Sequence, residues 1–188
     1  MDSIMGFDTW LLRLVNTGMA NPVFDLVMPF VTDIDNFTVV IALSVVGLAL
    51  FGRGKGRWTI VLIVLAVVTG DLTASLVKKT FARVRPCHEL EGIRLLTGCG
   101  GAFSFPSGHA TNIFASMVVL SLRYRKAAPA FLSLAVIVAY SRVYVGVHYP
   151  VDVVAGAGLG VVIALAVTAA DARLGRRLRG QGPAGDGT

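Results

Sequence analysis

Apolar residues occur along this chain in long runs, and polar residues gather in the short stretches between them. A helix that crosses a hydrocarbon core about 30 Å thick needs roughly 20 such residues. The pattern therefore predicts an all-α fold, a polytopic membrane helix bundle with five to six spanning helices and an N-terminal interfacial helix. Spans are predicted at 58–77, 107–122, 129–147 and 151–170, with a shorter fifth span at 37–51.

The chain before residue 37 follows this pattern less clearly. Residues 21–31 are apolar but too few to span alone, they contain two prolines and Asp25, and a polar stretch follows at 32–36. We interpret this segment as half-inserted or as part of a sixth, broken span. The opening residues around Trp10 are typical of an amphipathic helix at the membrane interface, with the cytoplasmic start of a sixth span as the alternative.

Composition limits the class of protein. Of the 188 residues 55% are hydrophobic and 15% are charged, and the mean hydropathy of +0.73 is far too apolar for an ordinary soluble domain. The net charge of +6 does not indicate nucleic-acid binding, because the basic residues fall between apolar runs. The length suits one membrane domain at 1–179 with its motif-bearing core at 58–170, and the Gly-rich stretch 180–188 is predicted to be a disordered tail.

Lysine and arginine cluster in three places that five spans would put on the same side of a membrane. Short cytoplasmic loops collect these residues, so this side is predicted to be the cytoplasm. The long loop 81–106 and the turn 146–150 then face the periplasm or the cell exterior, as expected for a protein of the bacterial inner membrane. The clusters are Arg53, Lys55 and Arg57; Arg123, Arg125 and Lys126; and Arg173, Arg176, Arg177 and Arg179.

Three further cations lie at the predicted outer ends of the helices. Lys78, Arg85 and Arg142 would share one small site, where their repulsion is costly unless a multiply charged anion binds. Phosphate is the natural candidate. Ser107 and Gly108 are typical of a helix start, with Ser107 as N-cap and Gly108 allowing a ligand to approach the backbone, so unpaired N–H groups would face the same anion.

Two histidines accompany these cations. His148 precedes Pro150, which suits the first position of a helix, and Asp152 follows four residues after His148, near enough to accept from one imidazole nitrogen. This contact would fix the tautomer and leave the other nitrogen free as a nucleophile or base. His109, on a different helix, is then available as the acid.

The pattern K-x6-R-P, then P-S-G-H, then S-R-x5-H-x3-D resembles the type 2 phosphatidic acid phosphatase (PAP2) family over about residues 58–170. The resemblance implies that His148 attacks phosphorus to form a phosphohistidine, that Asp152 orients it, and that His109 protonates the leaving oxygen. It also implies that no metal or other cofactor takes part, because cationic side chains neutralise the phosphate charge. The residues implied to hold the phosphoryl oxygens are Lys78, Arg85, Ser107, Gly108 and Arg142.

The resemblance and the apolar composition together predict a membrane enzyme that removes phosphate from a lipid. Undecaprenyl diphosphate is the preferred substrate, because the small bundle has no added domain, and phosphatidylglycerophosphate, phosphatidate and lipid A 1-phosphate are alternatives. A non-enzymatic alternative is a carrier or scaffold that binds a phospholipid without turnover. The expected partners are the lipid phosphate and the bilayer, and not nucleic acid; the oligomeric state stays open.

Polar residues outside the motifs have plainer interpretations. Asp71, within a predicted span, is a candidate for orienting Lys78, with a structural hydrogen bond as the alternative. Cys87 and Cys99, both in the outer loop, are predicted to form a disulfide, with free thiols as the alternative. The remaining residues are interpreted as interface cations (Lys79, Arg83 and Arg94), a loop residue (His88) and an aromatic belt (Tyr140, Tyr144 and Tyr149).

Overall fold

The fold is helical in the part of the chain that the computed structural model describes, residues 2–180, with side chains from 5 to 176. The predicted all-α class is confirmed, and the predicted tail beyond residue 180 lies outside the described residues. The α-helices are α1 (Asp2–Arg13), α2 (Pro22–Thr32), α3 (Thr38–Phe51), α4 (Arg53–Phe81), α5 (Pro86–Glu89), α6 (Gly108–Arg123), α7 (Ala128–Tyr144) and α8 (Pro150–Gly180). Three short helices of other types are η1 (Leu14–Gly18), η2 (Ile34–Phe37) and η3 (Arg125–Ala127).

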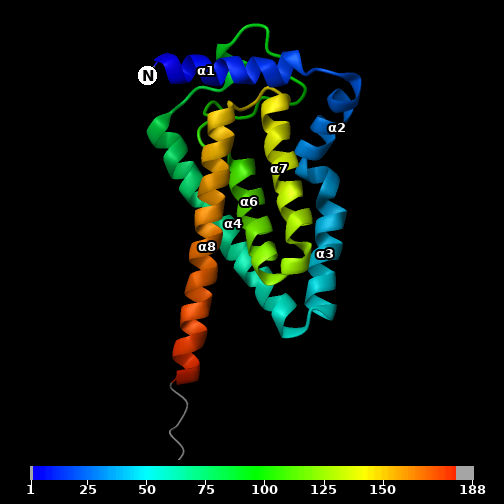
Figure 1. The fold of residues 1–188 in the computed structure, drawn as a ribbon, viewed down its shortest axis with the longest axis vertical. Coiled ribbons are helices and arrows are strands. Elements are labelled where there is room, and N and C mark those ends of the chain that lie inside the picture. Colours follow the sequence, from blue (N-terminus) through cyan, green and yellow to red (C-terminus); the bar gives the residue numbers. More distant parts are fainter. Residues whose placement is uncertain (1, 181–188) are drawn as a thin grey trace, which may run out of the picture.

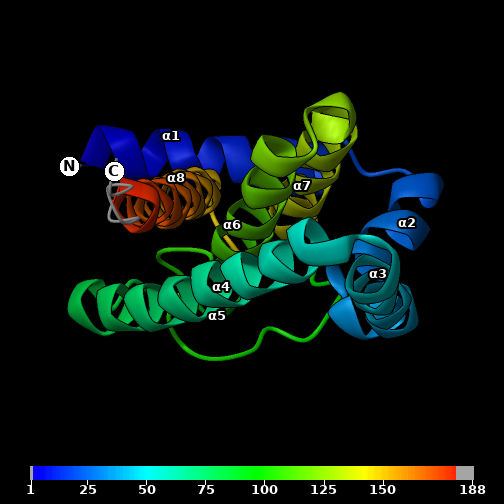
Figure 2. The ribbon, with the colours of Figure 1, turned by 90° about the horizontal axis from the view of Figure 1, so that it is seen from below.

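Helix α6 lies in the middle of the bundle and packs against α4, α7 and α8 (Figure 2). Two glycines of α8 allow this contact to be very close. A Cβ at Gly156 would lie 2.4 Å from the carbonyl oxygen of Ser107, and one at Gly160 would lie 2.3 Å from that of Thr111. Glycines four residues apart let two helix backbones approach, as is common between membrane helices. This contact joins the start of α6, where one of the sequence motifs lies, to α8 between Gly156 and Gly160.

Helix α1 lies across the end of the bundle at which α6 and α8 begin (Figure 1). Its buried face carries Asp8 and Leu12, and Val15 in η1 continues that face, whereas Phe7 and Trp10 are exposed. This two-sided pattern agrees with the amphipathic helix predicted around Trp10. Because α1 covers the end of the bundle, its buried face is in a position to contact the loops there.

The predicted number of membrane spans is matched only in part by the helices that are candidates for crossing a membrane. Among the described residues, four helical segments are long and apolar enough to cross a membrane: Ile34–Phe51, Arg53–Phe81, Arg125–Tyr144 and Pro150–Arg176. The count of five to six is therefore not confirmed. The predicted span at 107–122 forms α6, a helix of 16 residues, and α2 has only 11 residues before the chain breaks at Asp33. Both are shorter than the roughly 20 residues that a full crossing needs.

The three basic clusters lie at the end of the bundle opposite to α1. They occupy the turn between α3 and α4, the connection between α6 and α7, and the far part of α8 (Figure 1). The side chains of Arg177 and Arg179 fall outside the described residues. The bundle is therefore polarised, with the cationic clusters at one end and the sequence motifs at the other, as the topology argument requires.

Candidate active site

The motif residues come together at the end of the bundle covered by α1, although they belong to several separate segments of the chain. Lys78 lies in the last turn of α4, and Arg85 lies in the extended connection that follows. Residues 107–109 begin α6, Arg142 lies in the last turn of α7, and the turn 146–150 leads into α8. Helix α4 ends here because Ala82 adopts a left-handed conformation, with φ of 45°, which redirects the chain.

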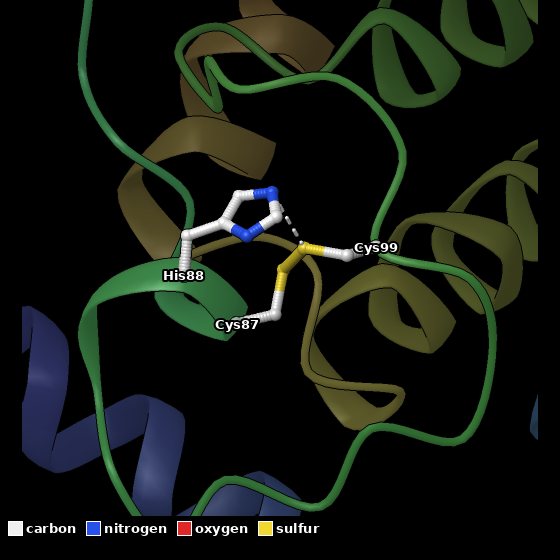
Figure 3. Close-up of side chains that lie close together, drawn as sticks. All are labelled: Cys87, His88 and Cys99. Atoms are coloured by element: carbon white, nitrogen blue, oxygen red, sulfur yellow. Dashed lines mark hydrogen bonds between the residues drawn. A yellow bond between two sulfur atoms is a disulfide. The ribbon is translucent and has the colours of Figure 1, made fainter.

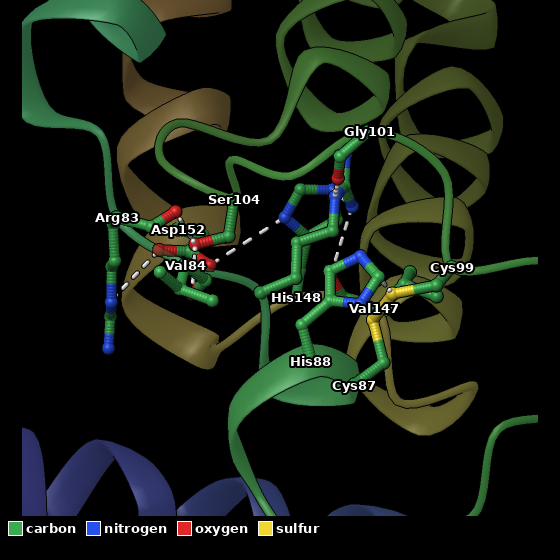
Figure 4. Close-up of a disulfide and its surroundings, with 11 residues drawn as sticks. Arg83, Val84, Cys87, His88, Cys99, Gly101, Ser104, Val147, His148 and Asp152 are labelled. Atoms are coloured by element: carbon green, nitrogen blue, oxygen red, sulfur yellow. Dashed lines mark hydrogen bonds and ion pairs between the residues drawn. A yellow bond between two sulfur atoms is a disulfide. The ribbon is translucent and has the colours of Figure 1, made fainter.

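His148 is almost completely buried, and its ring faces the carboxylate of Asp152 (Figure 4). Its Nε2 lies 3.0 Å from Nη1 of Arg85, and its Nδ1 lies 3.6 Å from Oδ2 of Asp152. A guanidinium only donates hydrogen bonds, so Nε2 must be the accepting, unprotonated nitrogen. The proton of the neutral ring is then on Nδ1, facing the carboxylate.

The charge state of His148 follows from its surroundings. Burial lowers the pKa of His148 to about 3; Asp152 opposes this shift, and the positive charges of Arg85 and Arg142 add to it. The imidazole is therefore neutral at pH 7, since a pKa below the pH leaves the ring unprotonated. A neutral imidazole with a lone pair on Nε2 is able to attack an electrophile held next to Arg85.

Asp152 is held by contacts on both carboxylate oxygens. Oδ2, which faces His148, accepts from the backbone N–H of Tyr149 at 3.0 Å. Oδ1 accepts from Nη1 of Arg83 at 2.8 Å. The carbonyl of Asp152 also accepts from the N–H of Ser107 at 2.9 Å, which ties the start of α8 to the start of α6. The carboxylate therefore has little freedom to rotate away from the histidine.

Arg85 is oriented by backbone carbonyls of two loops. Its Nε donates to the carbonyl of Gly101 at 2.6 Å, and its Nη1 donates to that of Val147 at 3.0 Å. Cys87 and Cys99, close in sequence to these contacts, are joined by a disulfide bond. The disulfide joins the chain just after Arg85 to the chain just before Gly101, so it holds the two partners of this hydrogen bond near each other.

The other predicted anion ligands carry few contacts of their own. Arg142 is buried, donates to Oγ1 of Thr32 at 2.6 Å, and has a buried Nε without a hydrogen-bond partner in the described part of the chain. Lys78 reaches the start of α6, where its Nζ lies 3.9 Å from the position that a Cβ of Gly108 would take. A buried cation with an unused donor suits a site that awaits an anion.

The start of α6 carries its cap and the second histidine. Ser107 is the N-cap and accepts from the N–H of Ala110 at 3.4 Å. His109 is exposed and makes no hydrogen bond among the described residues. Its ring is therefore open to a substrate at the end of the bundle.

Asp71 does not contact Lys78 directly. Its Oδ1 accepts from Nδ2 of Asn112 at 2.6 Å, which joins α4 to α6. Within the described residues no hydrogen bond or ion pair links Asp71 to Lys78. The structural hydrogen bond considered from the sequence is thus present, and a role of Asp71 in orienting Lys78 stays a prediction.

Two of the cations assigned to the membrane interface have structural partners instead. Arg83 bridges Asp152 and Asp8, with Nη2 to Oδ2 of Asp8 at 2.6 Å, so its interpretation as an interface residue is wrong. Arg94 pairs with Asp25 and donates to the carbonyl of Asn16.

The sequence analysis did not identify Asp8 as part of the site. A signal was available, because Asp8 shares the buried helical face of Leu12 and a lone carboxylate there needs a partner.

A further cluster near the site has the composition of a metal centre. The ligand atoms of Cys87, His88 and Cys99 lie within 4.8 Å of one another, and Nε2 of His88 is 3.3 Å from Sγ of Cys99 (Figure 3). Cysteine binds metal as a thiolate, and here both sulfur atoms are joined to each other. In this form the cluster is a disulfide with a histidine beside it.

The apolar bundle and the cluster of cations around a neutral histidine define a class of protein: a helical membrane protein with a buried cationic site at one end. The family model described as PAP2 superfamily matches residues 59–176, and the chain belongs to that family. The resemblance seen in the three sequence motifs is thereby confirmed.

Individual relatives agree in fold and sequence. An undecaprenyl-diphosphatase of Sulfolobus acidocaldarius is 32% identical over 163 residues, which cover 83% of this chain and 74% of the relative. A lipid A 1-phosphatase of Rhizobium johnstonii is 37% identical over 116 residues, 58% of this chain, and the match spans about half of the relative, 46%. The crystal structure of a PAP2-type phosphatidylglycerolphosphate phosphatase from Bacillus subtilis superposes with a TM-score of 0.74 at 26% identity, covering 92% of this chain and 88% of that one.

Proposed function

We propose that the chain is a membrane lipid phosphatase that transfers a phosphoryl group from a lipid to His148 and then to water. The observation that carries this proposal is the state of His148, a neutral imidazole with Nδ1 facing Asp152 and Nε2 facing Arg85. A nucleophile needs an available lone pair, and the neighbouring cations attract the phosphate that is attacked. The three relatives described above are named as phosphatases or a diphosphatase, which supports the same chemistry.

In the proposed reaction, Arg85 transfers its hydrogen bond from His148 to a phosphoryl oxygen when the substrate binds. Nε2 of His148 attacks phosphorus in line, and the bond from phosphorus to the lipid oxygen breaks as the bond to nitrogen forms. The leaving oxygen takes a proton from His109. Asp152 stabilises the positive charge that develops on the imidazole, as a carboxylate does in hydrolase triads.

In the second step water attacks the phosphohistidine and releases phosphate. His109, now unprotonated, accepts the proton of the attacking water, so the pair of steps returns it to its starting state. Lys78 and Arg142, together with the backbone N–H groups after Ser107, hold the phosphoryl oxygens during both steps. These positively charged groups supply the charge neutralisation for which other phosphoryl-transfer enzymes use Mg²⁺.

The mechanism predicts that activity survives EDTA and is inhibited by vanadate. Vanadate adopts the trigonal-bipyramidal geometry that phosphorus has in the transition state of phosphoryl transfer. The cations that stabilise this transition state should therefore bind vanadate tightly. The measurement is phosphate release by purified protein in detergent, with and without chelator and with increasing vanadate. Loss of activity on chelation, restored by Mg²⁺, would contradict the role given to the cations.

Undecaprenyl diphosphate is the proposed substrate, because the undecaprenyl-diphosphatase relative matches most of this chain. Phosphatidylglycerophosphate, phosphatidate and lipid A 1-phosphate are the alternatives, two of them supported by the names of a structural neighbour and a relative. The test is phosphate release from a panel of these purified lipids. Binding of a lipid without release of phosphate would instead favour the carrier or scaffold.

We also propose that the site faces the outside of the bacterial inner membrane, because the basic clusters lie at the opposite end of the bundle. Cysteine-accessibility labelling in intact cells is expected to modify single cysteines placed at 89–98 and not those placed at 53–57. The disulfide-forming cysteines are first replaced by serine, so that only the introduced thiol reacts. Labelling of the second group alone would reverse the topology.

A further inference from the structure

The side of Asp152 that faces away from His148 is occupied by a chain of charged groups. Oδ1 of Asp152 accepts from Arg83, and the same guanidinium donates to Asp8 with its other terminal nitrogen (Figure 4 shows Arg83 beside Asp152). Both distances are short, at 2.8 Å and 2.6 Å. Arg83 therefore bridges the carboxylate of Asp152, in the first turn of α8, and the carboxylate of Asp8, in α1.

Both carboxylate oxygens of Asp8 accept hydrogen bonds within this arrangement. Asp8 is 1% exposed, Oδ2 accepts from Arg83, and Oδ1 accepts from the N–H of Val151 at 2.9 Å. Val151 lies in the first turn of α8, whose N–H groups have no partner within the helix, so Asp8 caps α8 from a different helix. A buried carboxylate needs such partners, since an unpaired charge in the protein interior is strongly destabilising.

The orientation of Arg83 is restricted from a third direction. Its guanidinium lies over the ring of Tyr149, 3.9 Å from the ring centre, and the hydroxyl of Tyr149 donates to Glu89 at 2.9 Å. A planar guanidinium that stacks on a ring and forks between two carboxylates has its plane and its two donors fixed. A lysine at this position would offer charge but not the fork.

We propose that Asp8 and Arg83 are positioning residues, through which the N-terminal helix holds Asp152 in the orientation that keeps Oδ2 toward His148. The proposal rests on the proposed role of His148 as the nucleophile. Neither residue needs to touch the substrate. In the described residues the hydrogen bonds of Asp8 go only to Arg83 and Val151, so its effect on the reaction passes through the bridge and the start of α8.

The test compares Asp8→Asn and Arg83→Gln with the wild-type enzyme. Asparagine retains an oxygen for the N–H of Val151 and removes the charge that holds Arg83. We expect the rate of phosphohistidine formation, and with it kcat, to fall by about 10- to 100-fold, as is typical when the partner that orients a functional side chain is lost. KM should change by less than about threefold, because the cations that bind phosphate are unchanged. Arg83→Lys is expected to recover part of the loss.

The matched control is Arg94→Gln. Arg94 forms a similar ion pair with Asp25, between the outer loop and the N-terminal part of the chain, but it does not contact Asp152. This variant is expected to keep kcat within about threefold of the wild type. Thermal melting of all variants identifies any that are poorly folded, and for those the comparison uses the fraction that remains folded.

A double-mutant cycle separates positioning through the bridge from a general loss of stability. If Asp8 acts through Arg83, Asp8→Asn should cause little further loss of kcat in the Arg83→Gln background. Independent, multiplicative losses, a rise in KM with kcat unchanged, or wild-type kcat in both single variants would each overturn the inference while leaving the phosphatase proposal intact. A wild-type protein that releases no phosphate from any lipid would overturn both.

Discussion

His148→Ala is expected to abolish phosphate release from every substrate, whether the leaving group is a lipid alcohol, a lipid phosphate or a phenol. Without Nε2 no phosphohistidine forms, so the covalent route is lost as a whole. Removal of a hydrolase nucleophile lowers kcat by roughly 10⁶-fold, which takes activity to the assay background. The measurement is phosphate release, combined with rapid quenching of the wild type on a radiolabelled substrate to detect acid-labile, alkali-stable phosphate on the protein.

The matched control is His88→Ala, which removes a histidine from the same end of the molecule. His88 is exposed, and within the described residues the single polar contact of its side chain is with the sulfur of Cys99. Activity and labelling should both persist in this variant. Labelled protein in His148→Ala, or undiminished turnover, would show that another group is the nucleophile.

The residues of the proposed anion site could be predicted from the sequence, because the proposed chemistry requires given residue types at short, regular spacings. Asp152 follows His148 by about one helical turn, and Ser107 stands where a helix must begin, so local geometry alone brings these groups near their partners. The meeting of the motifs at one end of the bundle followed from the alternating direction of the helices. These parts of the site depend on periodicity, which a sequence displays.

The bridge from Asp152 through Arg83 to Asp8 could not be predicted from the spacing of residues in the sequence. Arg83 and Asp8 are 75 positions apart, and Asp8 and Val151 are 143 positions apart. Contacts between residues so far apart produce no repeating pattern in the sequence. In addition, an arginine near the end of a membrane helix is ordinarily an interface residue. Only the polarity of Asp8 on the buried face of an amphipathic helix pointed to a partner. Where that partner lies is decided by how α1 crosses the bundle, which tertiary packing determines.

The predicted lengths of the helices differ from the observed ones for a related reason. The apolar run 58–77 marks only the middle of α4, whose backbone hydrogen bonds continue into the polar residues at both ends, from Arg53 to Phe81. Conversely, α6 is flanked by the fixed turn at Ser107 and the basic connection after Arg123, so it is shorter than a full crossing. Hydropathy reports where a helix is apolar and not where its hydrogen bonds stop.

His109→Ala is expected to reduce phosphohistidine formation by an amount that depends on the leaving group. A general acid matters most when the departing oxygen is strongly basic, so the loss should be severe for an alkyl monophosphate, milder for a diphosphate lipid and mildest for an aryl phosphate. The difference among the three substrates should be measurable, since removing a general acid typically lowers the rate of the catalysed step by about 10²- to 10⁴-fold. The exposed ring of His109, without a hydrogen bond in the described part of the chain, is free to take this role.

The second step complicates steady-state rates, because His109 is also the proposed base when water attacks the phosphohistidine. With a good leaving group the first step becomes fast, and the hydrolysis of the intermediate then limits turnover in the variant. An initial burst of phenol, equal in amount to the enzyme, would reveal this change. The amplitude and rate of the burst isolate the step in which His109 acts as the acid.

The comparison that decides the role of His109 is therefore the rate of the first step for three leaving groups in one variant. A loss that grows with the basicity of the leaving oxygen supports proton donation by His109. An equal loss for all three would show instead that His109 helps to hold the phosphoryl group, because binding of the phosphoryl oxygens does not depend on what is attached to the departing one. His109→Gln serves as the control for size and hydrogen bonding, and it should show the same gradient, since an amide cannot supply the proton.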